Sequence, residues 1–116
     1  MTTTLTPDIC VIGGGSGGLT VAAAAAAFGV DVVLLEKGKM GGDCLNYGCV
    51  PSKAIIAAGK HAQSARDAAK YGVIIDEPKV DYAKVNSHIH DVIATIAPND
   101  SVERFQSLGV NVIEEA

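Results

Sequence analysis

Residues 9–18 read Ile-Cys-Val-Ile-Gly-Gly-Gly-Ser-Gly-Gly, an apolar run that changes abruptly into glycine. Four consecutive apolar residues predict a strand, Ile9–Ile12, buried on both faces of a parallel sheet. The alanine-rich residues 16–28 predict a helix that stops at Gly29. A second apolar run, Val32–Leu35, predicts the next buried strand. Together these segments predict a βαβ unit with a right-handed crossover.

The glycines between the first strand and the helix have the spacing Gly-x-Gly-x-x-Gly. Gly13 would allow a tight turn, Gly15 would let the backbone approach a diphosphate, and Gly18 would let helix and strand pack closely. Backbone N–H groups at the helix start, around Ser16 and Gly17, would point at the phosphates, and the helix dipole adds to the attraction. This turn therefore predicts a dinucleotide site.

Glu36 ends the second strand, 18 positions after Gly18. A carboxylate there can accept both hydroxyls of an adenosine ribose and would repel a 2′-phosphate. Lys37 follows it and is included among the expected cofactor-binding residues. A glycine-rich turn with a surface glutamate is the plainer alternative, but the strand before the turn and the helix after it favour nucleotide binding. The fingerprint alone does not separate FAD from NAD.

Residues 41–53 read Gly-Gly-Asp-Cys-Leu-Asn-Tyr-Gly-Cys-Val-Pro-Ser-Lys and place Cys44 and Cys49 five positions apart. A disulfide needs Cα atoms roughly 4.4–6.8 Å apart. Neither a regular helix nor an extended strand gives that separation at this spacing, so pairing requires a bent backbone, which Gly48 would permit. A helix that begins near Cys49 would stabilise its thiolate through the positive end of the helix dipole.

Two other interpretations of the cysteines compete with a redox-active pair: a metal site and incidental burial. No metal site is expected, because a zinc site wants four ligands and the third cysteine, Cys10, falls in a strand predicted to be buried. The pair could also be two small apolar side chains buried incidentally.

The rest of the chain predicts mostly helices. Residues 37–46 are expected to form a loop, residues 54–71 a second helix, and residues 73–75 a brief extended piece. Residues 110–113 predict a further strand.

A third helix is predicted from an N-cap at Asp81 to Ala97. Pro98 should end or kink it, and Asn99 or Asp100 could cap a short continuation to residue 108. One side of this helix carries its large aliphatic residues: Val85, Ile89, Val92, Ile93 and Ile96.

Composition limits the classes of function. The 116 residues are 48% apolar and 4% aromatic, which suits aliphatic helices packed on a sheet. A net charge of -4 without a basic cluster favours neither nucleic acid nor a membrane surface as partner. The first cation is Lys37 and no apolar run could span a bilayer, so a cytoplasmic location is expected. The cytosol keeps ordinary thiols reduced, so a disulfide there would be a working one.

Residues 13–18, Glu36 and residues 41–53 together resemble the start of the flavin-dependent pyridine nucleotide–disulfide oxidoreductases, such as dihydrolipoamide dehydrogenase, mercuric reductase and glutathione reductase. The resemblance runs from about Asp8 to the end of the chain. It implies an α/β fold: a Rossmann-like FAD-binding βαβ unit with a parallel sheet and additional helices, incomplete relative to the full family domain. It also implies FAD at the first nucleotide site, NAD(P)H as electron donor, a small-molecule disulfide or related thiol-reactive substrate, and a homodimer.

The resemblance implies a role for each residue of the second motif. Cys49 would be the charge-transfer thiol against the flavin, and Cys44 the interchange thiol that forms a mixed disulfide with substrate. Lys53 would lie close to flavin N5, where a cation stabilises a reduced, anionic flavin. Gly41 and Gly42 would let the loop lie along the cofactor, and Gly42 and Asp43 are expected to be among the cofactor-binding residues. The Ser-Lys-Ala continuation favours the dihydrolipoamide dehydrogenase and mercuric reductase branches.

Two positions depart from the family pattern. Asp43 stands where threonine is common, and Tyr47 where a small aliphatic residue is common. An acid beside Cys44 should disfavour its thiolate and slow its attack, which leaves the substrate open.

The family implies a chain several times longer. Residues 1–116 are expected to form the N-terminal part of an FAD/NAD(P)-binding domain, without the NAD(P)H and dimer-interface domains, and not to turn over alone. The alternative is a non-catalytic nucleotide-binding Rossmann module that takes FAD or NAD.

Overall fold

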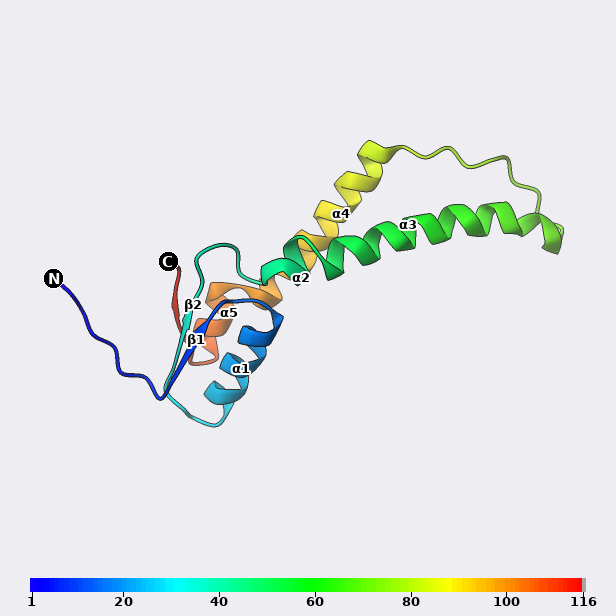
Figure 1. The fold of residues 1–116 in the computed structure, drawn as a ribbon. Helices are drawn as coiled ribbons and strands as arrows, with labels where there is room; N and C mark the ends of the chain where they lie inside the picture. The colour runs from blue at the N-terminus through cyan, green and yellow to red at the C-terminus, as the bar shows by residue number, and fades with distance from the viewer. Residues whose placement is uncertain (116) are drawn as a thin grey trace.

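The computed structural model describes residues 1–115, which form a body of sheet and helices and a long arm that projects from it (Figure 1). The radius of gyration is 20.2 Å and the extents are 69 × 29 × 18 Å. A compact domain of about 100 residues has a radius of gyration of about 13 Å. The arm therefore accounts for much of the length of the molecule.

The body is built on a three-stranded parallel sheet in the order β1-β2-β3. The strands are β1 (Ile9–Ile12), β2 (Val32–Leu35) and β3 (Asn111–Ile113). The carboxyl ends of all three lie at the same edge, because every pair is parallel. The predicted parallel α/β sheet is confirmed, with β3 one residue shorter than expected.

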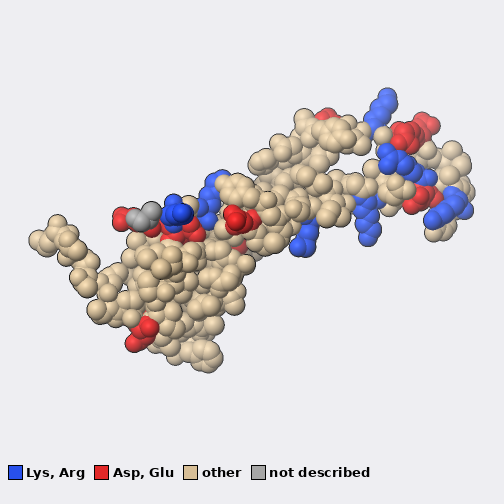
Figure 2. All heavy atoms as spheres, in the orientation of Figure 1, with Lys and Arg blue, Asp and Glu red and all other residues tan. Residues whose placement is uncertain are grey.

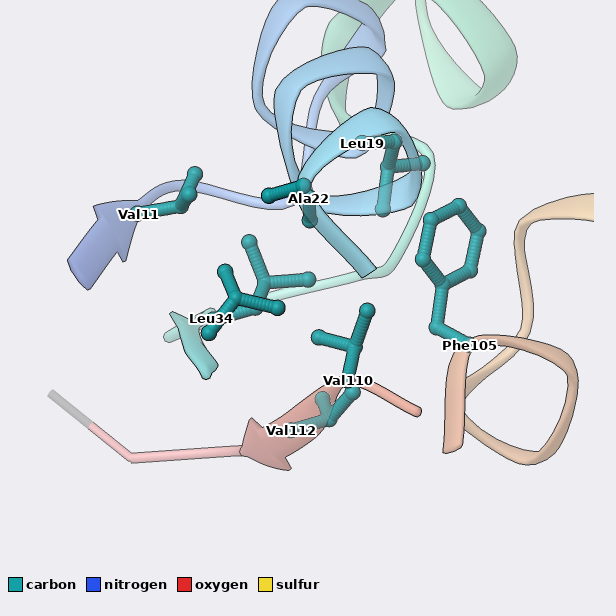
Figure 3. Close-up of a cluster of buried hydrophobic side chains, with 9 residues drawn as sticks. Val11, Leu19, Ala22, Leu34, Phe105, Val110 and Val112 are labelled. Atoms are coloured by element: carbon teal, nitrogen blue, oxygen red, sulfur yellow. The ribbon is translucent and has the colours of Figure 1, made fainter. Parts of the chain in front are cut away.

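One face of the sheet is covered by α1 (Ser16–Ala27) and by the short α5 (Val102–Ser107), as Figure 3 shows. Alanines on α1 let the helix approach the strands closely, and Ala22 is completely buried. Each large aliphatic side chain buried here contributes roughly 1.5–3 kcal/mol relative to exposure. The buried cluster consists of Val11, Leu19, Ala22, Ala25, Val32, Leu34, Phe105, Val110 and Val112.

The opposite face of the sheet is open along β1. Cys10 is exposed and the side chain of Ile12 is 85% exposed, whereas Val11, between them, is buried against α1. The prediction that the first strand is buried on both faces is therefore wrong for Cys10 and Ile12. Alternate residues of a strand point to opposite faces, and within residues 1–115 the helices of the body pack on one of them.

The arm consists of α3 (Cys49–Asp67), which continues as a turn of 3-10 helix, η1 (Ala68–Tyr71), and of α4 (Tyr82–Ile96) packed against it. The helix predicted for residues 54–71 thus begins five residues earlier, at Cys49. Residues 73–75 are exposed and form no strand.

The ends of α4 follow the sequence closely. Asp81 caps the helix by accepting a hydrogen bond from the Lys84 backbone N–H (3.2 Å), as predicted. The helix ends at Ile96, just before Pro98, which lies in the 3-10 turn η2 (Ala97–Asp100). The five aliphatic residues expected on one side of this helix are all at least partly buried.

The predicted cap of the next helix is wrong. Neither Asn99 nor Asp100 caps α5, because both belong to η2. Ser101 has the extended backbone of an N-cap, and its Oγ accepts a hydrogen bond from the Arg104 backbone N–H (3.2 Å).

Charged side chains on the face drawn in Figure 2 gather at the far end of the arm and near the loop that follows β2. Within residues 1–115, no helix combines the length and the apolar character needed to cross a bilayer.

Candidate nucleotide and disulfide site

The glycine turn joins β1 to α1 at the carboxyl edge of the sheet. Gly13 has a φ of +105°, which favours glycine, and a side chain at Gly13 or Gly17 would meet open space. A Cβ at Gly18 would instead collide with the carbonyl oxygen of Gly13. The roles predicted for Gly13 and Gly18 fit this geometry, and Ser16 and Gly17 form the exposed start of α1.

Glu36 lies beside this turn at the end of β2. Its Oε2 accepts a hydrogen bond from the Gly14 backbone N–H (2.6 Å), and its Oε1 accepts one from the Gly38 backbone N–H (2.7 Å). The bond from Gly38 is the main reason that the pKa of Glu36 lies below its ordinary value; partial burial opposes it, and Gly14 and Lys37 add to it. The carboxylate is therefore held ionised next to the turn.

The residues present fit the adenosine end of FAD. A cavity of about 360 Å³ opens beside Glu36 and is also lined by Ile12, Gly13, Lys37 and Glu115. Each carboxylate oxygen of Glu36 has a further lone pair for a ribose hydroxyl. The space over the glycine turn and the exposed N-terminus of α1 suit a diphosphate.

Residues 37–46 were predicted to form a loop, and this prediction is only partly right. The last five residues of the predicted loop form a short helix, α2 (Gly42–Asn46). The sequence offered no periodic apolar pattern for so short a helix. The backbone enters it through Gly41 (φ +92°) and Gly42 (φ +60°), two left-handed residues that glycine adopts readily.

The two motifs contact each other directly. The Gly41 backbone N–H donates to the carbonyl oxygen of Gly14 (2.8 Å). A Cβ at Gly42 would lie only 2.7 Å from the Cα of Gly15. The cysteine-bearing segment is thus docked on the glycine turn, backbone against backbone.

Cys44 and Cys49 form a disulfide, with their Cα atoms 4.6 Å apart. The bend predicted between them is present at Gly48, where a Cβ would lie 3.0 Å from the carbonyl oxygen of Asp43. Cys49 is exposed. Because it is the first residue of the 19-residue helix α3, its sulfur lies at the positive end of the helix dipole. Cys44 is half-buried on α2.

A cavity of about 320 Å³ lies beside Cys44, between α1, α2 and the start of α5. Its walls include Leu19, Ala23 and Ile96, and Arg104 also lines it. These lining residues could not be predicted from the sequence, because they come from segments as far apart as Ser16 and Phe105 and no local pattern links them.

Other residues of the second motif lie on the two helices that carry the cysteines, α2 and α3. Lys53 lies one helical turn beyond Cys49 on the same face of α3 and is exposed. Asp43 is exposed in the first turn of α2. The Lys39 Nζ lies 5.6 Å from the centre of the Tyr47 ring, a cation–π distance that gives Tyr47 a partner in this chain.

The role of Asn46 in the site was also not predicted from the sequence. Its Nδ2 donates to the carbonyl oxygens of Gly42 (2.9 Å) and Met40 (3.2 Å). Asparagine often bonds its own local backbone in turns, and an asparagine two residues before Gly48 was a usable signal for this.

A disulfide at a helix N-terminus, docked on a dinucleotide-type glycine turn, defines the class of nucleotide-dependent thiol–disulfide oxidoreductases. A model of the family described as "Pyridine nucleotide-disulphide oxidoreductase" matches residues 7–113. The chain belongs to this family, which confirms the resemblance seen in the sequence. The family uses FAD and NAD(P)H.

Relatives of known sequence agree. The chain is 43% identical over 108 residues to a dihydrolipoyl dehydrogenase of Halobacterium salinarum, covering 92% of this chain and 22% of the relative. It is 43% identical over 78 residues to that of Geobacillus stearothermophilus, covering 67% and 17%. The chain thus spans about one fifth of the length of the dehydrogenases that it matches.

A solved structure supports the fold. The copper(II) complex of an HOCl-induced flavoprotein disulfide reductase from Escherichia coli superposes with a TM-score of 0.71 at 21% identity, over 92% of this chain and 21% of that one.

Proposed function

We propose that this chain carries the FAD-binding turn and the redox-active disulfide of an FAD-dependent NAD(P)H:disulfide oxidoreductase. The observation that supports it most is the docking of the Cys44–Cys49 segment on the glycine turn, through Gly41 and Gly14. Two motifs with separate chemistries form one continuous site.

In this proposal the chain holds the cofactor at two places. Glu36 accepts the ribose hydroxyls, and backbone N–H groups at the start of α1, near Ser16, bind the diphosphate. Cys49 and Lys53, one turn apart on α3, would be the residues that interact with the flavin end of the cofactor. When bound, the flavin supplies two-electron transfer between NAD(P)H and the disulfide.

The cysteines then exchange with a substrate disulfide. Reduction of the Cys44–Cys49 bond takes two electrons and two protons. The Cys44 thiolate attacks one substrate sulfur, forms a mixed disulfide and releases the other substrate sulfur, which takes up a proton. Cys49 next attacks the Cys44 sulfur, which releases the second substrate thiol and restores the Cys44–Cys49 bond. The cavity beside Cys44 gives a substrate access to that sulfur.

We propose a small-molecule disulfide of the lipoamide type as substrate, with the dithiol dihydrolipoamide as its reduced form, because the relatives named above are dihydrolipoyl dehydrogenases. Mercuric reductase chemistry is the second candidate, on the Ser-Lys-Ala continuation at residue 52.

We further propose that residues 1–116 are the N-terminal part of an FAD/NAD(P)-binding domain. The proposed setting of the whole protein is a homodimer in the cytoplasm, where reduced thiols would let this disulfide cycle.

The proposal is tested with protein expressed from its complete coding sequence. FAD binding is followed by the change in flavin fluorescence, and NADH or NADPH oxidation is measured with lipoamide as acceptor. Tight FAD binding with turnover supports the proposal. FAD binding without turnover favours a non-catalytic module, and tighter binding of NAD than of FAD contradicts the cofactor assignment.

A further inference from the structure

The side chain of Asn46 hydrogen-bonds the backbone on both sides of Gly41, at the pair of left-handed glycines where α2 begins. Its Nδ2 donates to the carbonyl oxygen of Met40, just before the glycine pair, and to that of Gly42, at its end. Both acceptors of this one nitrogen are main-chain atoms of the same bend.

This bend decides where Cys44 lies. Gly41 and Gly42 contact the glycine turn and also lead the chain into the helix that carries Cys44. Helix α2 has five residues, too few to be stable through its own backbone bonds. The two hydrogen bonds of the Asn46 side chain therefore help to stabilise the conformation of α2.

Cys49 begins the long α3, and the hydrogen bonds of the Asn46 side chain go to Met40 and Gly42 rather than to that helix. The disulfide therefore joins a sulfur on a long helix to a sulfur on a short one. Whether the two sulfurs meet depends on how firmly α2 is held.

We propose that Asn46 is a positioning residue that keeps Cys44 within bonding reach of Cys49 and so favours the disulfide over the dithiol. The inference rests on the proposed redox function of the pair. Asn46 touches neither sulfur through a hydrogen bond; it acts through the conformation of Gly41 and Gly42.

The test compares wild type with Asn46→Asp, which keeps the size of the side chain and replaces the donor by an acceptor. Protein from the complete coding sequence is equilibrated with mixtures of reduced and oxidised dithiothreitol, alkylated, and assayed by mass spectrometry at Cys44 and Cys49. In this exchange dithiothreitol loses two electrons and two protons, and the disulfide gains them. We expect the equilibrium constant for disulfide formation to fall about tenfold, a rise in potential of about 30 mV for a two-electron couple.

The matched control is Gln63→Glu on the arm. Gln63 also donates through its carboxamide, to Asp67 Oδ1 (3.0 Å), and the change is again amide to acid. Its equilibrium constant should equal that of wild type. Asn46→Ser, which keeps one donor on a shorter side chain, should give a smaller shift in the same direction and serves in place of Asn46→Asp if that variant does not fold.

A purely structural role predicts another result. It would lower the unfolding temperatures of the oxidised and dithiol forms equally and leave the equilibrium constant within twofold of wild type, which would overturn the inference. A wild-type pair that does not interconvert with dithiothreitol would contradict the proposed function itself, and this inference with it.

Discussion

The Gly14 backbone N–H donates a 2.6 Å hydrogen bond to Glu36 Oε2, which ties the turn after β1 to the end of β2 across 22 positions. The carboxylate also accepts from Gly38, so it organises the backbone on both sides of the expected ribose. Glu36 therefore has a structural role in the protein before any nucleotide binds.

Glu36→Gln should lower stability in a pH-dependent way. The folded-state pKa of Glu36 lies below its ordinary value of 4.5, so the fold favours the ionised form. The loss relative to wild type should be about 1 kcal/mol or less at pH 7, because the side chain is partly screened by water. It should shrink as the pH falls below about 4.5 and through the lowered pKa. Urea unfolding at pH 7 and pH 3 measures this, and an equal difference at both pH values would contradict it.

Gly18→Ala should strongly destabilise the body. The new Cβ would collide with the Gly13 carbonyl oxygen, and overpacking of this kind costs about 1–3 kcal/mol or more. Gly17→Ala is the matched control, since nothing lies within 4 Å of its Cβ. It should be neutral or stabilise α1 by up to about 1 kcal/mol. Equal midpoints for the two variants in thermal unfolding would refute the packing argument.

Gly42→Ala should separate the two motifs. A Cβ there meets the Gly15 Cα at 2.7 Å, and φ +60° adds roughly 1–2 kcal/mol of strain. We expect weaker FAD binding and a lower unfolding temperature. Gly59→Ala on α3, whose Cβ would meet nothing within 4 Å, should leave FAD affinity unchanged. Titration by flavin fluorescence compares them, and wild-type affinity in Gly42→Ala would argue against the docking.

The two cysteines should differ in their spectra. In the FAD-loaded protein from the complete coding sequence, Cys49→Ser should abolish the long-wavelength thiolate-to-flavin absorption after reduction. Cys44→Ser should retain it, because Cys49 is then a free thiolate at the N-terminus of α3. Absorption that persists in Cys49→Ser would reverse the roles given to the two residues.

The body of the fold was predictable because its signals are local. The apolar run Val32–Leu35 and the spacing of Gly13, Gly15 and Gly18 specified the strands and the turn. The exposure of Cys10 was not predictable, since an apolar strand has the same pattern whether one or both of its faces are covered within the chain.

The pairing of Cys44 and Cys49 was predictable from the sequence, but the contacts around the pair were not. A five-residue spacing indicated that Cys44 and Cys49 need a bend, and the disulfide confirms the geometry. The short helix α2 depends on two left-handed glycines and the Asn46 side chain, which no periodicity reveals. The cavity beside Cys44 joins segments far apart in sequence, so only the fold could identify it.

Cys49 is the residue of α3 nearest the body, so the arm begins at the disulfide. With 19 residues, α3 is roughly 28 Å long. The Cys44–Cys49 bond therefore closes one of the two chain connections between the arm and the body, the other being η2.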